Sequence, residues 1–327
     1  MTTARRIATH LTQLGVAVQV LPTQPLPEDA DPIIRRFRPQ IVHALHAVKA
    51  GIIAHQIAQS LGVPLVVTLT GTDVHGDLQD AQKRPAMAAV LRDAAAIVTF
   101  TPEVASEVRE ALPEVAGKIF VIPQGVWLPP QEVWDVRKQL GLAKETPLLL
   151  LPANIRKVKR PSLAIEGVAK GRQLGVDAHL LLAGAILETD EGQRVEEALK
   201  QHAWLHFLGA VPSERMGSVY EAADIVLNTS LHEGGMANTL LEAMWLKRPV
   251  LVSAVVGNIS LVRHEETGLL FQDADELAQQ AHRLLTDKAL RQRLITNAFR
   301  WVRQHCDPTK EAERYRQVYA EAIKRGG

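Results

Sequence analysis

The amino-acid sequence predicts an α/β protein made of two doubly wound domains, each built on a parallel β-sheet. Short aliphatic and β-branched runs alternate with segments of helical periodicity along the whole chain. These runs are almost uniformly apolar, as expected of parallel strands that helices cover on both faces. The chain has 327 residues, which is enough for two domains with separate cores.

Ten strands are expected, five in each half of the chain. In the first half they lie at residues 16–21, 41–46, 64–70, 96–101 and 119–126. In the second half they lie at residues 147–153, 178–185, 205–211, 224–230 and 249–257. The chain opens on a helical pattern, "TTARRIATHLTQLG", where a doubly wound domain ordinarily has a strand and a glycine-rich turn. We therefore expect the first domain to lack its opening strand.

A change of composition separates the two halves, because a Pro-Pro pair and a short helix interrupt the rhythm after Val126. We expect an N-terminal Rossmann-like domain on the acceptor side at 1–127, a linker at 128–145 and a C-terminal Rossmann-like domain at 146–305. A final helix is expected at 306–327, with the first domain as a candidate surface for it. Ligands of open parallel sheets bind outside the carboxyl ends of the strands, so a cleft between the domains is the expected binding site.

Composition excludes several function classes. The 37 basic and 36 acidic side chains give a net charge of +1, which provides no basic face for a nucleic acid. The single cysteine, Cys306, permits neither a disulfide framework nor a cysteine metal cluster. The apolar runs are one strand long, and no signal-peptide core opens the chain. We expect a cytoplasmic protein, and peripheral membrane contact is not indicated. We interpret the stretch 31–39 as ordinary helix surface rather than as a contact for an anionic or membrane-bound acceptor.

The stretch "SLHEGGMANTLLEAM" (230–244) joins an expected strand to a helix that should begin near Thr239. Free N–H groups of the glycine turn and the helix amino terminus suit a phosphate. Glu242, placed in the first helical turn, can accept hydrogen bonds from the vicinal hydroxyls of a ribose. Two simpler interpretations remain open: "TLLE" also fits a capping box, and Glu233 also fits a solvated loop carboxylate.

Four cations follow the expected strand 147–153, namely Arg156, Lys157, Lys159 and Arg160. At the carboxyl end of a strand they could neutralise a diphosphate. We interpret Lys157 and Arg160 as solvated surface residues. His46 and His75 are more often structural than catalytic in such positions, and His43 with His46 lacks a third ligand for a metal. We therefore expect neither a metal nor a cofactor.

Several motifs carry a resemblance to a known family. "RKVKRPSLAIEG", "LHFLGAVPSERMGSVYEAADIVLNTSLHEGG" and "VVGNISLVRHEETGLLF" resemble the nucleotide-sugar half of group 1 (family 4) retaining glycosyltransferases. "LTGTDVHGDLQDAQKRPAMAAVLRDAAAIVTFTPEV" is similar to the glycosyltransferase 1 domain-containing branch. The resemblance covers nearly the whole chain. It implies a GT-B fold, a nucleoside diphosphate sugar bound by the second domain, and no metal.

The resemblance also implies roles for individual residues. Arg156 and Lys159 match the pair that holds the donor diphosphate, Glu242 matches the ribose ligand, and Glu233 matches the residue that contacts the transferred sugar. The remaining donor contacts would come from the turn and the helix start, at Gly234, Gly235, Met236, Ala237, Asn238 and Thr239. Many relatives carry a histidine where this chain has Thr70, so that contact is missing or is replaced by Thr70 or Asp73.

The implied reaction moves a sugar from a nucleoside diphosphate sugar to an unknown acceptor, with retention at the anomeric carbon. Negative charge builds on the leaving diphosphate, which the cations and the helix amino terminus would stabilise. Two alternatives stay open: a nucleotide-sugar epimerase of the same architecture, and a non-catalytic nucleotide-sugar-binding relative. A dehydrogenase is disfavoured, because no expected strand is followed by Gly-x-Gly-x-x-Gly.

Overall fold

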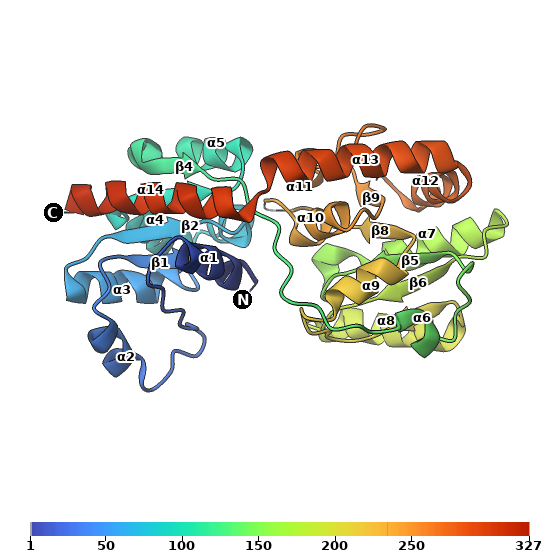
Figure 1. The fold of residues 1–327 in the computed structure, drawn as a ribbon, viewed down its shortest axis with the longest axis horizontal. Helices are drawn as coiled ribbons and strands as arrows, with labels where there is room; N and C mark the ends of the chain where they lie inside the picture. Colours follow the sequence, from blue (N-terminus) through green and yellow to red (C-terminus); the bar gives the residue numbers. More distant parts are fainter. Residues whose placement is uncertain (1, 234, 327) are drawn as a thin grey trace. The chain divides into compact units, whose positions relative to one another are not determined.

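The computed structural model describes residues 2–233 and 235–326, and the chain forms two compact units (Figure 1). Unit 1 comprises Met1–Gly125 and Cys306–Gly327, and unit 2 comprises Val126–His305. Each unit contains a parallel β-sheet with helices packed against it, which confirms the predicted α/β fold class.

The described residues of unit 1 form a four-stranded parallel sheet in the order β1-β2-β3-β4. The strands are β1 (Val42–Leu45), β2 (Leu65–Thr68), β3 (Ala96–Thr99) and β4 (Ile119–Val121). The helices are α1 (Thr2–Gln13), α2 (Ala30–Phe37), α3 (Gly51–Leu61), α4 (Arg84–Asp93), α5 (Pro102–Ala111) and α14 (Pro308–Gly326), with short helical turns η1 (Asp73–Asp77) and η2 (Pro113–Lys118).

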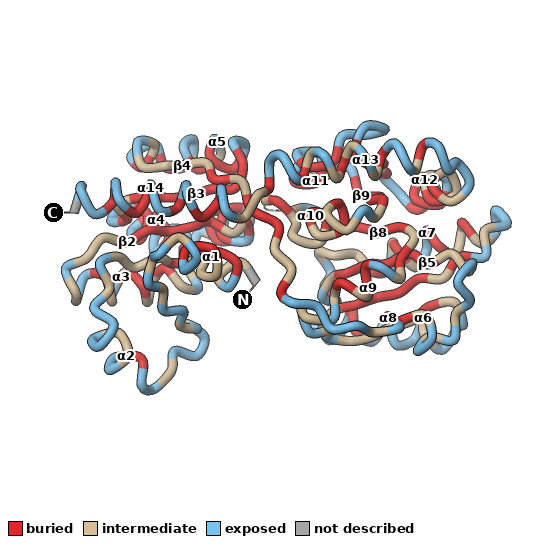
Figure 2. Tube along the Cα trace, viewed as in Figure 1, coloured by how far each residue is buried: buried red, intermediate tan, exposed pale blue. Residues whose placement is uncertain are grey.

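Both faces of the central strands β2 and β3 are buried, and these strands are drawn red in Figure 2. Leu65 and Val67 of β2 pack with α3, α4 and α5, whereas Val66 packs with α1 and α14. Successive residues of a strand point to opposite faces, so a strand covered on both sides must be apolar throughout. This explains why the apolar runs of the sequence predicted β1 to β4.

The prediction of a strand at residues 16–21 is wrong. The segment has no regular secondary structure, and it pairs with no strand in the described part of the chain. Val16 and Val18 pack partly against the core beneath α1, while Gln19 is exposed. This alternation of half-buried and exposed residues resembles a strand, yet a strand also needs a hydrogen-bonded neighbour for its backbone groups.

Helix α14 joins unit 1 through a buried ion pair with α1. Arg6 Nε donates to Glu311 Oε2 at 2.7 Å, and Arg6 Nη2 donates to Glu311 Oε1 at 3.0 Å. Each side chain is 1% exposed. The two charges lie far apart in sequence but neutralise each other in the core, so neither can be removed alone without leaving the other uncompensated.

We predict that Glu311→Gln destabilises the protein by about 3–5 kcal/mol, because a buried guanidinium loses its counter-charge. Urea unfolding would measure the change. The double variant Arg6→Met/Glu311→Leu should recover most of the loss, since it removes both charges. A double variant that is less stable than the single one would contradict this account.

His43 on β1 lies in a polar cluster that also ties α14 to the sheet. Its Nδ1 hydrogen-bonds with the Tyr319 hydroxyl at 2.7 Å, and its Nε2 with Thr68 Oγ1 at 2.8 Å. The Tyr315 hydroxyl is 3.1 Å from the same Thr68 oxygen. Burial lowers the pKa of His43 from 6.5 to about 4, so the ring is neutral in the folded protein.

The depressed pKa of His43 predicts a pH-dependent stability. Between pH 6.5 and about 4 the unfolded chain binds a proton that the folded chain does not, so stability falls as the pH falls through this window. The loss should reach up to about 3 kcal/mol. Thermal midpoints measured from pH 7 to pH 4 should decline less steeply for His43→Leu than for the wild type. Parallel slopes would contradict the assignment.

Within the described part of unit 2, six parallel strands follow the order β10-β9-β8-β5-β6-β7. The strands are β5 (Leu148–Leu151), β6 (His179–Leu182), β7 (Leu205–Phe207), β8 (Ile225–Asn228), β9 (Val250–Ser253) and β10 (Leu269–Phe271). The helices are α6 (Val136–Gln139), α7 (Pro161–Gln173), α8 (Thr189–Gln201), α9 (Met216–Ala222), α10 (Asn238–Trp245), α11 (Val256–Ile259), α12 (Ala274–Thr286) and α13 (Lys288–His305), with the turn η3 (Lys157–Lys159). Strand β10, only three residues long, was not among the predicted strands.

The segment expected as a linker, 128–145, packs on unit 2. Gly217 N–H donates to Gln131 Oε1 at 2.7 Å, and Arg137 Nη2 pairs with Asp224 Oδ2 at 2.8 Å. These contacts attach the segment to α9 and to the residue before β8. Across residues 2–233 and 235–326, no helix has the length and apolar character needed to cross a membrane.

Candidate functional site

The carboxyl edge of the unit 2 sheet contains a topological switch point. Strand β5 lies between β6 and β8, so the connections that leave β5 and β8 diverge at this position. Ligands of doubly wound sheets bind where the strand order reverses. Both predicted constellations lie here: the cation-rich loop 152–160 follows β5, and the glycine turn 229–237 follows β8.

Arg160 joins these two segments. Its Nε donates to the Thr229 carbonyl at 2.6 Å and its Nη2 to the Ser230 carbonyl at 3.2 Å. In return, Thr229 Oγ1 donates to the Lys159 carbonyl at 2.6 Å. The interpretation of Arg160 as a solvated surface cation is therefore wrong, because its guanidinium satisfies the carbonyl groups left unpaired where β8 ends.

Glu233 and Lys159 form an ion pair across the same two segments. Lys159 Nζ is 2.5 Å from Glu233 Oε1, and both side chains are largely buried. The same carboxylate oxygen accepts from Ser230 Oγ at 2.7 Å and from Asn228 Nδ2 at 3.0 Å. Burial opposes the charged form, but the Lys159 charge and these hydrogen bonds outweigh it and lower the pKa of Glu233. The interpretation of Glu233 as a solvated loop carboxylate is wrong.

A second layer of polar groups holds Glu233 from the side of β9 and α11. Asn258 Nδ2, fully buried, donates to the Ser253 carbonyl at 3.0 Å, and Ser253 Oγ donates to the Ser230 carbonyl at 2.7 Å. Gly257 approaches the turn so closely that a Cβ there would overlap the Glu233 carbonyl and lie 2.6 Å from Glu233 Cβ. The "GN" pair in "VVGNIS" therefore supports the turn that carries Glu233.

We predict that Gly257→Ala destabilises the protein by about 1–3 kcal/mol, because the added methyl group must displace the Glu233 backbone. Gly171→Ala is the matched control, since its Cβ would meet Ala278 only at an ordinary 3.9 Å. Alanine is the better helix former by about 0.5–1 kcal/mol, so this control should be neutral or stabilising. Thermal unfolding distinguishes the two; equal effects would refute the close approach.

Glu242 lies on α10 and is oriented by a neighbour that the sequence did not indicate. The hydroxyl of Tyr220, on α9, donates to Glu242 Oε2 at 2.8 Å. Burial, reinforced by the carboxylate, raises the pKa of Tyr220 well above its ordinary value, so the phenol stays a donor. Helix α10 begins at Asn238, which makes Glu242 its fifth residue and Ala237 its N-cap. The capping-box interpretation and the placement in the first turn are both wrong.

Arg156 is the other predicted diphosphate ligand. The residue is half-buried in the loop after β5, and its Nε has no hydrogen-bond partner among the described residues. Lys159 N–H donates to the Arg156 carbonyl at 2.9 Å, which places the two cations one short turn apart. A buried guanidinium N–H without an acceptor is costly, and an anion supplies an acceptor that also carries charge.

The remaining predicted donor contacts lie around the start of α10. Gly235, Met236 and Ala237 precede the helix, and Asn238 and Thr239 are its first two residues. Met236 is buried, while the other four are partly exposed. Gly234 lies outside the described residues.

Unit 1 contains the turn with Thr70 and Asp73, the two candidate replacements for a histidine contact. The Asp73 carboxylate is fully buried and accepts N–H groups from Thr70, Gly71 and Ala47, at 3.0, 2.8 and 3.1 Å respectively. The three hydrogen bonds fix the conformation of the turn and occupy the carboxylate oxygens. Asp73 therefore offers no contact to a ligand.

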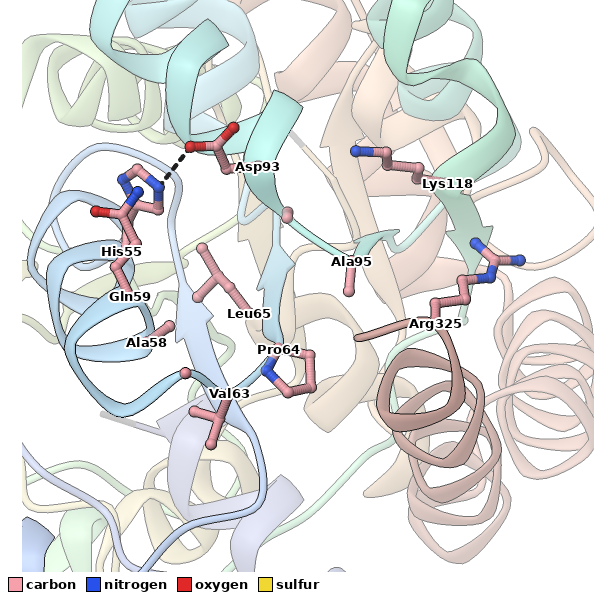
Figure 3. Close-up of a pocket in the computed structure, with 12 residues that line it drawn as sticks. His55, Ala58, Gln59, Val63, Pro64, Leu65, Asp93, Ala95, Lys118 and Arg325 are labelled. Carbon is pink, nitrogen blue, oxygen red and sulfur yellow. Dashed lines mark hydrogen bonds and ion pairs between the residues drawn. The ribbon is translucent and has the colours of Figure 1, made fainter. Parts of the chain in front are cut away.

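A cavity of about 520 Å³ lies at the amino edge of the unit 1 sheet, where β2 and β3 begin (Figure 3). This edge is opposite to the one that carries the turn with Thr70 and Asp73. His55 Nε2 is 2.8 Å from Asp93 Oδ2 on one side of it, and Lys118 and Arg325 lie on the other. Parallel sheets bind ligands at the carboxyl ends of their strands, and this cavity is at the amino ends.

Two parallel-sheet units, with the polar groups of the second gathered where β5 and β8 end, define a GT-B protein. Among solved structures, Anabaena HepE in complex with UDP-glucose matches with a TM-score of 0.77 at 20% identity, covering 95% of this chain and 88% of that one. Sucrose-phosphate synthase from Thermosynechococcus elongatus matches with a TM-score of 0.75 at 24% identity, covering 90% and 76%. These likenesses concern the fold.

Sequence comparison assigns the family. Residues 132–301 match the group 1 glycosyl transferases, and residues 4–125 match the glycosyl transferase 4-like domain. Glycosyltransferase 1 domain-containing protein 1 of Xenopus tropicalis is 29% identical over 262 residues, which are 78% of this chain and 76% of that protein. The 2-deoxystreptamine glucosyltransferase of Streptomyces kanamyceticus is 31% identical over 75% of this chain and 66% of its own. The chain belongs to the group 1 glycosyltransferases, and it is a glycosyltransferase.

Proposed function

We propose that this enzyme transfers a sugar, with retention at the anomeric carbon, from a nucleoside diphosphate sugar bound at the carboxyl edge of the unit 2 sheet. The observation that carries the proposal is the buried Nε of Arg156, which has no acceptor among the described residues, one short turn from Lys159. HepE, of the same fold, is bound to UDP-glucose in its structure. That structure supports a nucleotide-sugar donor.

In this proposal Arg156 and Lys159 bind the donor diphosphate. An ammonium group has three N–H donors, so Lys159 can keep its bond to Glu233 and still donate to a phosphate oxygen. Glu233 holds the Lys159 ammonium in place and contacts the transferred sugar. Glu242, with its carboxylate oriented by the Tyr220 hydroxyl, accepts hydrogen bonds from the ribose.

The chemistry follows from where charge develops. The bond from the anomeric carbon to the diphosphate oxygen breaks, and a bond from that carbon to an acceptor oxygen forms on the same face. The acceptor hydroxyl gives its proton to the leaving diphosphate. Preorganised cations stabilise this departing charge without reorganising during the step, so Arg156 and Lys159 take the role that a metal ion would otherwise fill.

The first test is thermal unfolding of the wild type with UDP-, GDP- and ADP-glucose. A ligand at a hundred times its dissociation constant stabilises by about 2.7 kcal/mol. We expect one nucleotide to raise the midpoint, and Glu242→Ala and Arg156→Ala to abolish that shift. Glu196→Ala, an exposed acidic residue on α8 of the same unit, is the control and should keep it.

The outcomes separate the alternatives. No shift in the wild type with any donor would overturn the proposed site. A shift that survives both substitutions would place the donor elsewhere. Binding followed by an epimerised donor, with no transfer to any acceptor, would identify an epimerase. Binding with no reaction at all would leave a non-catalytic relative.

A further inference from the structure

A second polar cluster lies at the carboxyl ends of β1 and β2 in unit 1. His46 directly follows β1, and its φ of 91° is in the left-handed region, which side-chain-bearing residues rarely adopt. The His46 N–H donates to the Thr68 carbonyl at 2.8 Å, and its carbonyl accepts from Gly51 at 2.9 Å. Backbone strain of this kind persists where the surroundings impose it, and it is concentrated at functional sites.

The hydrogen bonds of the His46 ring determine where its proton lies. Nδ1 accepts N–H groups from Val48 and Lys49, both at 3.2 Å, so this nitrogen has to be unprotonated. The proton is therefore on Nε2, which is 3.0 Å from Thr72 Oγ1 and 3.7 Å from Asp77 Oδ2. Burial is the main cause that lowers the pKa of His46, in keeping with a neutral ring.

Asp77 ends the π-helical turn η1 and is 7% exposed. Its Oδ1 pairs with Lys83 Nζ at 3.1 Å, while Oδ2 has no hydrogen-bond partner in the described part of the chain. The turn itself is held by the Asp73 carboxylate, so Asp77 is not needed for that purpose. Single π-helical turns are rare and frequently mark functional sites, and a buried oxygen without a donor calls for an explanation.

We propose that Asp77 Oδ2 and His46 Nε2 form the subsite that binds a hydroxyl group of the sugar acceptor. This inference rests on the proposed function and adds to it the acceptor class, a neutral polyol. A hydroxyl oxygen can lie about 2.8 Å from both atoms, because they are 3.7 Å apart. The acceptor hydroxyl accepts a hydrogen bond from the N–H group of His46 Nε2 and donates a hydrogen bond to Asp77 Oδ2.

Charge selects a hydroxyl over other ligands. The carboxylate repels an anion. Its charge is already balanced by Lys83, so a cation gains less than it would at an unpaired carboxylate. A neutral O–H group supplies the missing donor without adding charge. The hydroxyl of Thr72, an exposed residue, lies 3.0 Å from His46 Nε2, and the acceptor hydroxyl takes over that position.

The test measures sugar transfer from the radiolabelled donor that stabilises the wild type. The probe acceptors are myo-inositol and D-glucose, which are neutral, and 2-deoxystreptamine, which is cationic, with water as a fourth. Asp77→Asn should raise the KM for the neutral acceptors at least about tenfold, a free-energy change of about 1.4 kcal/mol. Where water is the acceptor, the rate of donor hydrolysis should fall by the same factor. The donor-induced thermal shift should stay unchanged, because the donor binds unit 2.

Asp80→Asn is the matched control. Asp80 carries the same group three residues away, pairs with the same Lys83 at 3.6 Å and is partly exposed, so neither KM nor the donor shift should change. Thr72→Val should leave the KM for the neutral acceptors equal or lower it. The acceptor hydroxyl displaces the threonine hydroxyl from His46 Nε2, so removing that hydroxyl takes nothing from the bound state.

Each contrary result is informative. If Asp77→Asn and Asp80→Asn have the same KM, or if Thr72→Val raises it as much as Asp77→Asn, the subsite is refuted while the proposed function stands. A selective loss of 2-deoxystreptamine transfer would replace the hydroxyl by an ammonium group and refute the neutral class. A wild type that binds donors but transfers sugar to no probe, water included, overturns both proposals.

Discussion

The ion pair between Lys159 and Glu233 is the interaction on which the carboxyl edge of the unit 2 sheet depends. It joins the loop after β5 to the turn after β8. These two strands are adjacent in the sheet, whereas Lys159 and Glu233 are 74 positions apart in the chain. Arg160 and Thr229 reinforce the same junction through backbone carbonyls. A partly buried pair is strong only when its remaining lone pairs are satisfied, and Ser230 and Asn228 donate to the same carboxylate.

In both units a buried charged group needs a partner, and some of these groups have all their partners within the protein while others do not. Arg6 with Glu311 is a closed pair that joins two helices, and Asp73 is fully used by backbone N–H groups. Among the residues described, the Nε of Arg156 in unit 2 lacks an acceptor and Oδ2 of Asp77 in unit 1 lacks a donor, and these two atoms carry the two proposals.

Much of the fold could be predicted from the sequence because parallel strands buried on both faces are apolar without interruption. The runs that became β2, β3, β5, β8 and β9 are buried along their whole length, and those that became the other predicted strands are mainly apolar. The errors came from properties that depend on neighbours: the segment 16–21 has strand-like residues and no strand to pair with, and β10 is a three-residue strand defined by its pairing with β9. The interpretation of Arg160 as a surface charge failed because the sequence does not show that the Thr229 carbonyl, just after β8, lies within hydrogen-bond distance of its guanidinium.

By itself the sequence determined the α/β class, the family and the placement of Arg156, Lys159 and Glu233 in the segments that follow strand ends, since these follow from local patterns and motifs. Only the tertiary structure decided which groups meet: Lys159 with Glu233, Tyr220 with Glu242, and His46 with Thr72. The physical reason is that hydrogen bonds and ion pairs act over about 3 Å, whereas their partners here are separated by tens of residues that the sheet order brings together.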